Sequence, residues 1–486
     1  MRRKTDDNIK ESGRIISYFS GIAKVRGLSR VFMHEVLLDA QEAEIGIVIG
    51  FDEQIVEVLI FSEKFDYTAP VFRSGKLFSV AVSDACSGRV LNGLGKPIDG
   101  LGDIDGEQWT VFNEAPAVID REPVSEPLTT GIKIIDSALP LGRGQRELII
   151  GDRGLGKSAI AVDTVLNQRE EEHPVHCIYV LCGERREKMR EIVTLFKKKN
   201  AFLYTTVVAA TAGDSFAMQY LAPFIGCTIG EYFRNNGKDA LVIYDDLSKH
   251  AKTYRDIALL LERAPGREAY PGDIFTLHAK LLERSAKLSR EKGGGSLSAL
   301  PIIETQEGDI TSFIPTNIIS ITDGQIYLER GLYQKGFLPA VNVGLSVSRV
   351  GSQAQAKPLA EVTKGIRLVL SQYKELQKLI QMETVISEDA QSKIHRGTLM
   401  VELLKQDKHT FVGWEEQVVL FYVIEEGFLD DVGEDDWRRF ETLLLELMRN
   451  KYQGVLVKLK KGEFDDELKG KIKELVADFK REFLSV

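Results

Sequence analysis

The octapeptide Gly151-Asp152-Arg153-Gly154-Leu155-Gly156-Lys157-Ser158 decides the fold of the centre of this chain. It matches the phosphate-loop pattern G-x-x-x-x-G-K-[ST] at every defined position. The apolar run 147–150 enters it, and residues 159–166 leave it with helical spacing of apolar residues. Glycines let backbone amides close around phosphate oxygens, and a helix start offers a positive dipole end. We therefore predict strand, phosphate-binding loop and helix, with Lys157 on the outer phosphates and the Ser158 hydroxyl on Mg²⁺.

Asp245 is a candidate for the carboxylate that a phosphate loop needs near its magnesium ion. It directly follows the apolar run 240–244, and ligands of parallel sheets bind beyond the carboxyl ends of the strands. Asp246 comes next, and an alternative is that both residues only cap the helix that begins near Leu247. We expect Asp245 to serve the ion because it lies closest to the end of the predicted strand.

Glu184 follows a second apolar run, 177–182, at the same predicted edge of the sheet. A carboxylate there is suited to orient and polarise the water that attacks a γ-phosphate. Alternatively, Glu184 is a surface residue that pairs with Arg185 or Arg186. The residues by themselves leave both interpretations open.

The pattern outside these motifs divides the chain into three predicted domains. Residues 1–82 read as short strands with glycine punctuation, which indicates a small barrel or sandwich. Residues 83–358 alternate apolar runs with helical patterns, which is typical of a parallel α/β sheet. Residues 359–486 carry apolar stripes at helical spacing and predict a helical bundle. The fold class is therefore multidomain α+β, and the strands expected in the middle region are 147–150, 177–181, 205–210, 240–244 and 318–321.

Length and composition agree with this division and exclude several classes of protein. A chain of 486 residues predicts about three domains. The net charge is −9, from 63 basic and 72 acidic residues, which argues against a nucleic-acid binder. No apolar run is long enough to predict a membrane span, and residues 1–10 are polar, so we expect no secretory signal. The 4 cysteines lack zinc spacing and predict buried, reduced thiols.

Several long stretches make the chain resemble the alpha subunits of F-type rotary ATP synthases. The resemblance runs from about residue 13 onward and covers nearly the whole chain. The stretches that carry it are Val124–Pro127, Gly131–Lys133, Leu141–Leu148, Ile243–Lys249, Pro265–Asp273, Leu300–Gln306 and Val343–Ser352.

This resemblance implies an N-terminal β-barrel, a central RecA-like α/β phosphate-loop domain and a C-terminal helical bundle. It also implies that three such chains alternate with three beta subunits around a central gamma stalk, with a delta-type stator subunit and a membrane ion-conducting sector as further partners. Such alpha subunits bind ATP or ADP with Mg²⁺, while catalysis lies mostly on beta. The expected setting is the cytoplasmic face of a bacterial membrane, with H⁺ or Na⁺ as the coupling ion and no nucleic acid bound.

The resemblance also implies roles for three residues. Arg349 matches the arginine finger that alpha supplies to the catalytic site of the neighbouring beta subunit, where such a group stabilises charge in the transition state. Ser346 matches a second position tied to activity. Gln406 matches a residue of the pocket that receives the nucleotide base.

The chain departs from the usual alpha pattern at several positions of the site. Glu184 stands where alpha subunits usually carry Gln, and the phosphate loop has Gly154-Leu155 and Ser158 in place of Gln-Thr and Thr. In the base-pocket region Leu338 replaces a usual Arg, and Lys408 replaces a usual Gln. The N-terminus is short and lacks the further helical segment that family members usually carry, which puts attachment to the stator in question. Glu184 raises the hypothesis that this chain's own site retains hydrolytic capacity.

Two other functions compete with the alpha-subunit interpretation. Lys157, Ser158, Glu184, Asp245 and Arg349 together form a complete hydrolytic set, so a self-sufficient hexameric ATPase is an alternative. A ring-shaped RNA translocase that shares the core fold is a third hypothesis, and the acidic net charge argues against it.

Overall fold

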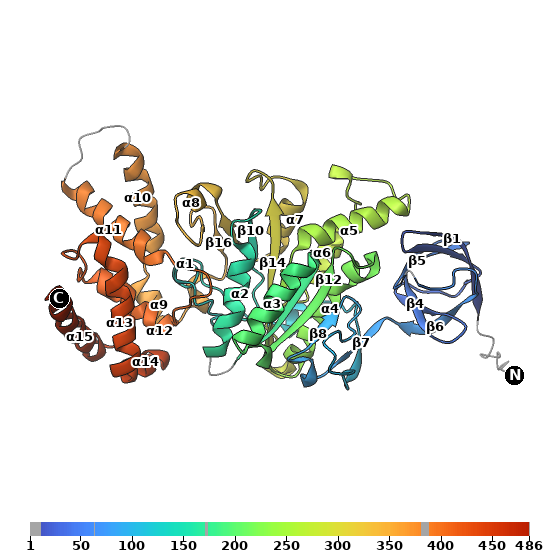
Figure 1. Ribbon diagram of the computed structural model, residues 1–486, viewed down its shortest axis with the longest axis horizontal. Helices are drawn as coiled ribbons and strands as arrows, with labels where there is room; N and C mark the ends of the chain where they lie inside the picture. Colours follow the sequence, from blue (N-terminus) through green and yellow to red (C-terminus); the bar gives the residue numbers. More distant parts are fainter. Residues whose placement is uncertain (1–10, 63, 171–173, 381–387, 486) are drawn as a thin grey trace. The chain divides into compact units, whose positions relative to one another are not determined.

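The computed structural model describes residues 11–62, 64–170, 174–380 and 388–485 (Figure 1). The expectations for the first ten residues lie outside this range. The chain divides into two compact units. Unit 1 comprises Met1–Glu122, Val175–Ile303 and Thr311–Ile321, and unit 2 comprises Pro123–Pro174, Glu304–Ile310 and Thr322–Val486.

The N-terminal part of unit 1 is a closed six-stranded barrel, drawn in blue in Figure 1. Its strands follow the order β1-β2-β5-β4-β3-β6, and every pairing is antiparallel. Apolar side chains such as Val25, Leu37, Val48 and Val58 fill it. This confirms the small barrel predicted from short strands. The strands are β1 (Ser12–Phe19), β2 (Ile22–Arg26), β3 (Glu35–Leu38), β4 (Glu44–Phe51), β5 (Ile55–Ile60) and β6 (Val71–Leu77).

The remainder of unit 1 holds parallel strands in the order β14-β13-β11-β12-β8. Residues 205–211 and 240–245 are buried throughout, as expected for strands covered on both faces. Two further strands, β7 (Ser79–Val82) and β9 (Glu107–Thr110), form an antiparallel pair. The parallel strands are β8 (Val90–Asn92), β11 (His176–Glu184), β12 (Thr205–Thr211), β13 (Asp239–Asp245) and β14 (Ser296–Thr305), and the helices are α3 (Arg186–Lys198), α4 (Phe216–Asn235), α5 (Leu247–Leu260), α6 (Ile274–Leu282) and α7 (Phe313–Ile321).

The prediction of a strand at 318–321 is wrong, because these residues end helix α7. Ile314, Ile318 and Ile321 are buried at spacings of four and three, which is the period of a helix. A short apolar run cannot distinguish a buried strand from a buried helical face. The strand of this region is instead β15 (Gly324–Leu328), three residues further along.

Unit 2 contains the phosphate loop between β10 (Leu148–Asp152) and α2 (Lys157–Asn167). Strand β10 pairs in parallel with β15, which in turn pairs antiparallel with β16 (Val347–Ser348). Short helices α1 (Lys133–Ala138) and α8 (Arg330–Gln334) flank these strands in sequence.

The C-terminal part of unit 2 is helical, as predicted, and is drawn in orange to red in Figure 1. Asp465 caps the last helix through Leu468 N at 2.9 Å, and Leu468, Ile472 and Val476 are buried on its predicted stripe. The helices are α9 (Lys357–Val362), α10 (Ile366–Ile380), α11 (Glu388–Leu404), α12 (Trp414–Glu425), α13 (Trp437–Lys451), α14 (Gln453–Lys460) and α15 (Asp466–Leu484).

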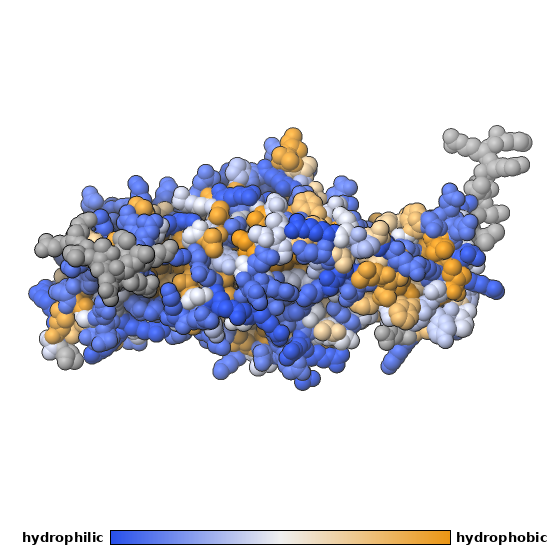
Figure 2. Space-filling view, turned by 90° about the horizontal axis from the view of Figure 1, so that it is seen from above, coloured by the Kyte–Doolittle hydropathy of each residue, from blue (hydrophilic) through white to orange (hydrophobic). Residues whose placement is uncertain are grey.

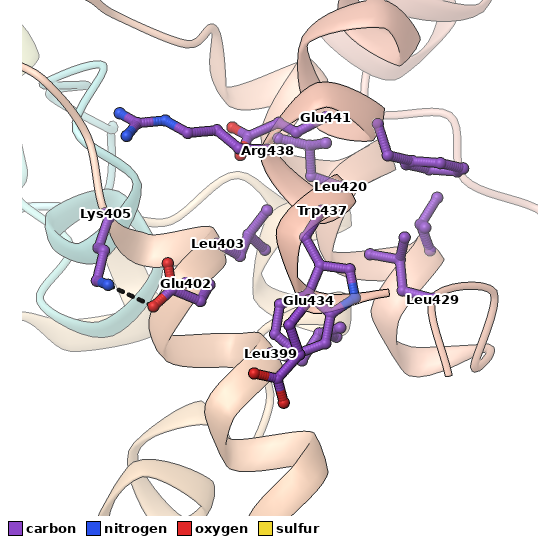
Figure 3. Close-up of a pocket in the computed structure, with 12 residues that line it drawn as sticks. Leu399, Glu402, Leu403, Lys405, Leu420, Leu429, Glu434, Trp437, Arg438 and Glu441 are labelled. Atoms are coloured by element: carbon purple, nitrogen blue, oxygen red, sulfur yellow. Dashed lines mark hydrogen bonds and ion pairs between the residues drawn. The ribbon is translucent and has the colours of Figure 1, made fainter. Parts of the chain in front are cut away.

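A small pocket of about 50 Å³ lies among these helices (Figure 3). Leu399, Leu403 and Leu420 line it beside the Trp437 ring. Glu441 also lines it, and its carboxylate accepts a hydrogen bond from the buried ammonium of Lys133 in α1. This hydrogen bond connects helix α1, which precedes the phosphate loop in the sequence, to helix α13.

The cysteines are buried and the surface shown in Figure 2 is mainly hydrophilic, as expected for a chain of this composition. All four cysteines are free and buried, which confirms their prediction as buried thiols. Figure 2 shows one face of the molecule, on which hydrophilic residues predominate and hydrophobic ones gather in separate small groups. Within the described residues, every helix is too short or too polar to cross a membrane.

Candidate functional site

The phosphate loop has the predicted order of strand, loop and helix. All residues of β10 are buried, and helix α2 begins at Lys157 directly after Gly156. Gly154 and Gly156 adopt φ values of 84° and 99°, a left-handed backbone that glycine accepts without strain. The Lys157 ammonium is 7% exposed and donates hydrogen bonds of 2.8 Å to the carbonyl oxygens of Gly151 and Asp152. These two hydrogen bonds therefore close the loop around the Lys157 side chain.

Asp152 holds the loop in place instead of facing solvent. Its buried carboxylate accepts hydrogen bonds from Thr305 Oγ1 at 2.7 Å and Gly308 N at 2.8 Å, and it forms an ion pair with Arg330 at 3.1 Å. Burial raises the pKa of Asp152, but these hydrogen bonds and the Arg330 charge outweigh it, so the net pKa is lowered. No motif marks Arg330, which follows β15, so its role could not be predicted from the sequence. Arg153 is exposed and Leu155 is buried.

A pocket of about 570 Å³ opens beside the phosphate loop within unit 2. Its volume fits a nucleoside-sized ligand, and it is mostly apolar with a few polar groups. The two departures of the base-pocket region, Leu338 and Lys408, both line it. The lining residues are Ile132, Gly154, Leu155, Gly156, Ala159, Ile160, Asp163, Tyr333, Leu338, Pro339, Gln406, Asp407, Lys408 and Thr410.

Gln406 lines this pocket, but its amide group is engaged within the protein. The side-chain oxygen accepts a hydrogen bond from Lys133 N at 2.9 Å. The side-chain nitrogen donates to Gly131 O at 2.7 Å and to Thr410 O at 2.8 Å. Gln406 therefore fixes the 406–410 loop as a wall of the pocket.

Asp163 and His409 fix the same loop from α2. The Asp163 carboxylate accepts hydrogen bonds from His409 N at 3.0 Å and from His409 Nδ1 at 2.9 Å. Burial raises the pKa of Asp163, although the His409 bonds act in the opposite direction. No sequence pattern marks this pair, because the two residues are 246 positions apart.

In unit 1, three carboxylates meet at the ends of β11 and β13. Ligand oxygens of Glu184, Asp245 and Asp246 all lie within 4.8 Å of one another. Asp246 caps α5 by accepting Lys249 N at 2.8 Å, which confirms the capping alternative for this residue. Asp245 does not cap the helix, and Tyr179 donates its hydroxyl to Asp245 Oδ2 at 2.8 Å. Carboxylate oxygens are the ligands that Mg²⁺ prefers, so the donor set fits that ion.

Two lysine ammonium groups neutralise much of this acidic cluster. Lys188 lies 2.9 Å from Asp245 and 3.2 Å from Glu184, and Lys249 pairs with Glu184 and lies 3.3 Å from Asp246. Burial raises the pKa of Glu184, but the lysine charges and hydrogen bonds outweigh it and lower the net pKa. Glu184 thus has charge partners, although they are not the two arginines considered from the sequence. Lys188 was missed, and its i+4 spacing from Glu184 was the available signal.

Arg349 is exposed at the end of β16 in unit 2. Its backbone N–H donates to Asp323 O at 2.9 Å, and its guanidinium makes no hydrogen bond or ion pair with any described residue. Ser346 is buried, and its hydroxyl donates to Asn342 O at 2.7 Å and accepts Tyr327 N at 2.9 Å. Ser346 therefore shapes the segment that presents Arg349.

Glu147, at the entrance to β10, is a buried acid that the sequence analysis did not single out. It is fully buried, and its Oε2 accepts Gln145 Nε2 at 2.8 Å. Gln145 also donates to Ser348 Oγ at 3.2 Å, next to Arg349. Burial raises the pKa of Glu147 well above its ordinary value, despite the Gln145 bond and the Arg349 charge. Burial therefore favours the neutral form of this carboxyl.

A glycine-rich loop between a buried strand and a helix, beside a pocket of nucleoside size, defines a phosphate-loop nucleotide-binding protein. The sequence profile of the ATP synthase alpha/beta family, nucleotide-binding domain, matches residues 131–348, and that of the ATP synthase alpha/beta chain, C terminal domain, matches residues 355–479. The chain is 47% identical over 480 residues to ATP synthase subunit alpha of Aquifex aeolicus (strain VF5), covering 98% of this chain and 95% of that protein. It is 46% identical over 479 residues to ATP synthase subunit alpha of Helicobacter acinonychis (strain Sheeba), with coverage of 98% and 95%. The chain therefore belongs to the ATP synthase alpha/beta family, among its alpha subunits.

Proposed function

We propose that this chain binds ATP or ADP with Mg²⁺ at a regulatory site and completes the catalytic site of a neighbouring beta subunit. The observation that carries this proposal is the phosphate loop with a 570 Å³ pocket beside it in one unit. The chain functions as the alpha subunit of an ATP synthase complex, an enzyme that makes or hydrolyses ATP. Its nucleotide-binding domain supports the binding of ATP and ADP.

The phosphate loop supplies the contacts to the nucleotide. Backbone N–H groups of the loop and of the first turn of α2, which begins at Lys157, are suited to cradle the phosphates. Lys157 exchanges its two carbonyl bonds for phosphate oxygens when the nucleotide enters. The pocket wall that includes Gln406 surrounds the base. In unit 2, the Ser158 hydroxyl would hold Mg²⁺, which would neutralise charge on the β- and γ-phosphates when bound. In unit 1, the Asp245 carboxylate is a second proposed ligand for a divalent ion.

Arg349 acts on the neighbouring beta subunit. Its exposed guanidinium lacks a partner among the described residues, so it is available to a phosphate of another chain. Such a group stabilises the charge that spreads over the transferred phosphoryl group in the transition state. Ser346 keeps Arg349 in position through its bonds to Asn342 and Tyr327.

Membership among the alpha subunits implies assembly with a beta subunit and other subunits of the complex. The proposal includes a ring of three alpha and three beta chains, a central gamma stalk and a delta-type stator subunit. It also includes a membrane sector that conducts H⁺ or Na⁺, with this chain on the cytoplasmic face of a bacterial membrane.

The test is ATP turnover of the assembled complex that carries Arg349→Ala or Lys157→Ala in this chain. We expect Arg349→Ala to lower kcat by about 10³–10⁵-fold, as the loss of an arginine finger does. We expect Lys157→Ala to leave most of the turnover, because the nucleotide site of this chain is proposed to be regulatory. Lys357→Ala removes an exposed charge eight residues from Arg349 and serves as the matched control.

Turnover that survives Arg349→Ala in an intact complex contradicts the finger assignment. A large loss with Lys157→Ala shows instead that this chain's own site hydrolyses ATP, with Glu184 as the carboxylate. Turnover by the purified chain alone favours the self-sufficient hexamer over the alpha-subunit role. Gel filtration of each variant complex checks that the assembly remains intact.

A further inference from the structure

Lys188 brings a positive charge directly to Asp245, the residue proposed as a magnesium ligand. Its Nζ lies 2.9 Å from Asp245 Oδ2 and 3.2 Å from Glu184 Oε1. The Asp245 side chain is 2% exposed and that of Lys188 is 28% exposed. The ammonium therefore reaches from the surface of α3 onto a buried oxygen at the end of β13.

Lys188 remains charged at neutral pH in this position. Burial lowers the pKa of Lys188, but the charges of Asp245 and Glu184 outweigh burial and raise the net pKa. A unit positive charge about 3 Å from the ligand oxygen acts strongly in a partly buried site, where the effective dielectric constant is well below that of water. The Lys188 ammonium therefore repels any second cation that approaches Asp245.

The same oxygen cannot serve Lys188 and a divalent ion equally well. Mg²⁺ binds oxygen ligands at about 2.0–2.1 Å and demands near-octahedral geometry. Asp245 Oδ2 already accepts hydrogen bonds from Lys188 and, at 2.8 Å, from the Tyr179 hydroxyl. The other two carboxylates are also engaged, since Lys249 pairs with both Glu184 and Asp246. A divalent ion must therefore displace the Lys188 ammonium or bind against its charge.

We propose that Lys188 is a tethered cation that competes with the divalent ion for Asp245 and makes this chain's site bind that ion weakly. The inference rests on the proposed function, which assigns Asp245 to Mg²⁺. The plain alternative is an i,i+4 ion pair with Glu184 on helix α3. Such a pair contributes little and leaves metal affinity unchanged when it is removed.

The experiment measures Mn²⁺ binding to the purified full-length chain by electron paramagnetic resonance of the free ion, with Mn²⁺ alone and with Mn²⁺ plus ATP. Lys188→Gln removes the charge at similar side-chain length, and Lys188→Arg keeps it. Lys198→Gln is the matched control, because Lys198 is an exposed lysine in the last turn of the same helix. Asp245→Asn removes the proposed ligand. Circular dichroism confirms that each variant is folded.

We expect Lys188→Gln to tighten Mn²⁺ binding by at least about tenfold, the effect that a unit charge about 3 Å away has even at the dielectric constant of water. Lys188→Arg and Lys198→Gln keep the weak affinity of the parent chain, and Asp245→Asn loses the site. Equal affinities for Lys188→Gln and Lys198→Gln, with binding still lost in Asp245→Asn, overturn the inference alone. Unchanged binding in Asp245→Asn overturns the assignment of Asp245 and the inference with it.

Discussion

Gln406→Leu is expected to weaken nucleotide binding without changing which base the pocket prefers. The Gln406 side chain is buried, and its amide bonds Lys133 N, Gly131 O and Thr410 O at 2.9, 2.7 and 2.8 Å. Leucine has a similar volume and fills the same space, but it makes none of these bonds. The Lys133 N–H then remains buried without its acceptor, whereas the Gly131 carbonyl keeps its hydrogen bond from Val412 N at 3.0 Å.

The structure sets the size of this effect. Each neutral hydrogen bond contributes about 0.5–1.5 kcal/mol net, and a buried polar group left unpaired costs about 1–3 kcal/mol. We therefore expect the free energy of unfolding to fall by about 2–5 kcal/mol. The 406–410 loop forms a wall of the pocket, so binding must reorder it. Affinity falls about tenfold for each 1.4 kcal/mol that this reordering costs.

The assay is equilibrium titration of the purified chain with ATP and with GTP, paired with thermal unfolding in the absence of nucleotide. We expect both affinities to fall by the same factor, because the Gln406 amide is turned toward the backbone. Lys408→Gln is the control, since Lys408 is exposed on the pocket and does not hold the loop. A variant that loses ATP affinity but keeps that for GTP refutes this reasoning, because it makes Gln406 a reader of the base.

Three further predictions concern buried ionisable groups. Glu231→Leu is expected to cost about 3–5 kcal/mol in unfolding by denaturant, because it removes the counter-ion of two buried guanidinium groups, Arg284 at 2.5 Å and Arg234 at 3.6 Å. Combining it with Arg284→Met is expected to restore only part of the loss, since Arg234 stays buried without Glu231. Burial lowers the pKa of His250 to about 4 and of His278 to about 3, so both are neutral in the folded chain, and stability present above the unfolded pKa near 6.5 is lost as pH falls toward 4. Each histidine accounts for about 2 kcal/mol by pH 5, and a pH series of melting temperatures that shows no decline below pH 6.5 contradicts this account. Glu147→Gln is expected to change stability at pH 7 by no more than about 1 kcal/mol, because burial raises the pKa of Glu147 well above its ordinary value and favours the neutral carboxyl, which the amide resembles. A larger loss in chemical denaturation contradicts this.

The parts of the fold that local pattern controls were predictable from the sequence. The glycines and the Lys-Ser pair of 151–158 predict the loop because their chemistry is local, and the strands 177–181 and 240–244 are continuous apolar runs. The run 318–321 failed because a short apolar segment fits a strand and a helix equally well. The helical spacing of Ile318 and Ile321 from the buried Ile314 becomes apparent only once the start of helix α7 is known.

The site depends on contacts that no local pattern contains. Gln406 bonds Lys133 across 273 residues, and Asp152 is held by Arg330 across 178. Such pairs form only when the chain has folded, so the spacing of residues in the sequence does not predict them. The resemblance supplied Gln406 as a residue of the base pocket, but its hydrogen bonds had to come from the structure.

Closure of the N-terminal barrel limits how this part of the chain can meet another protein. Each of its six strands has a neighbour on both sides, and β1 meets β6 at Ser12 and Gly13, so among the described residues no strand of the barrel has an entirely unpaired edge for an incoming strand. A companion must recognise side chains and loops, and their charges and shapes are set by sequence. Association through the described strands of the barrel is thus selective, and it differs from the copy-to-copy strand addition that an open sheet edge allows.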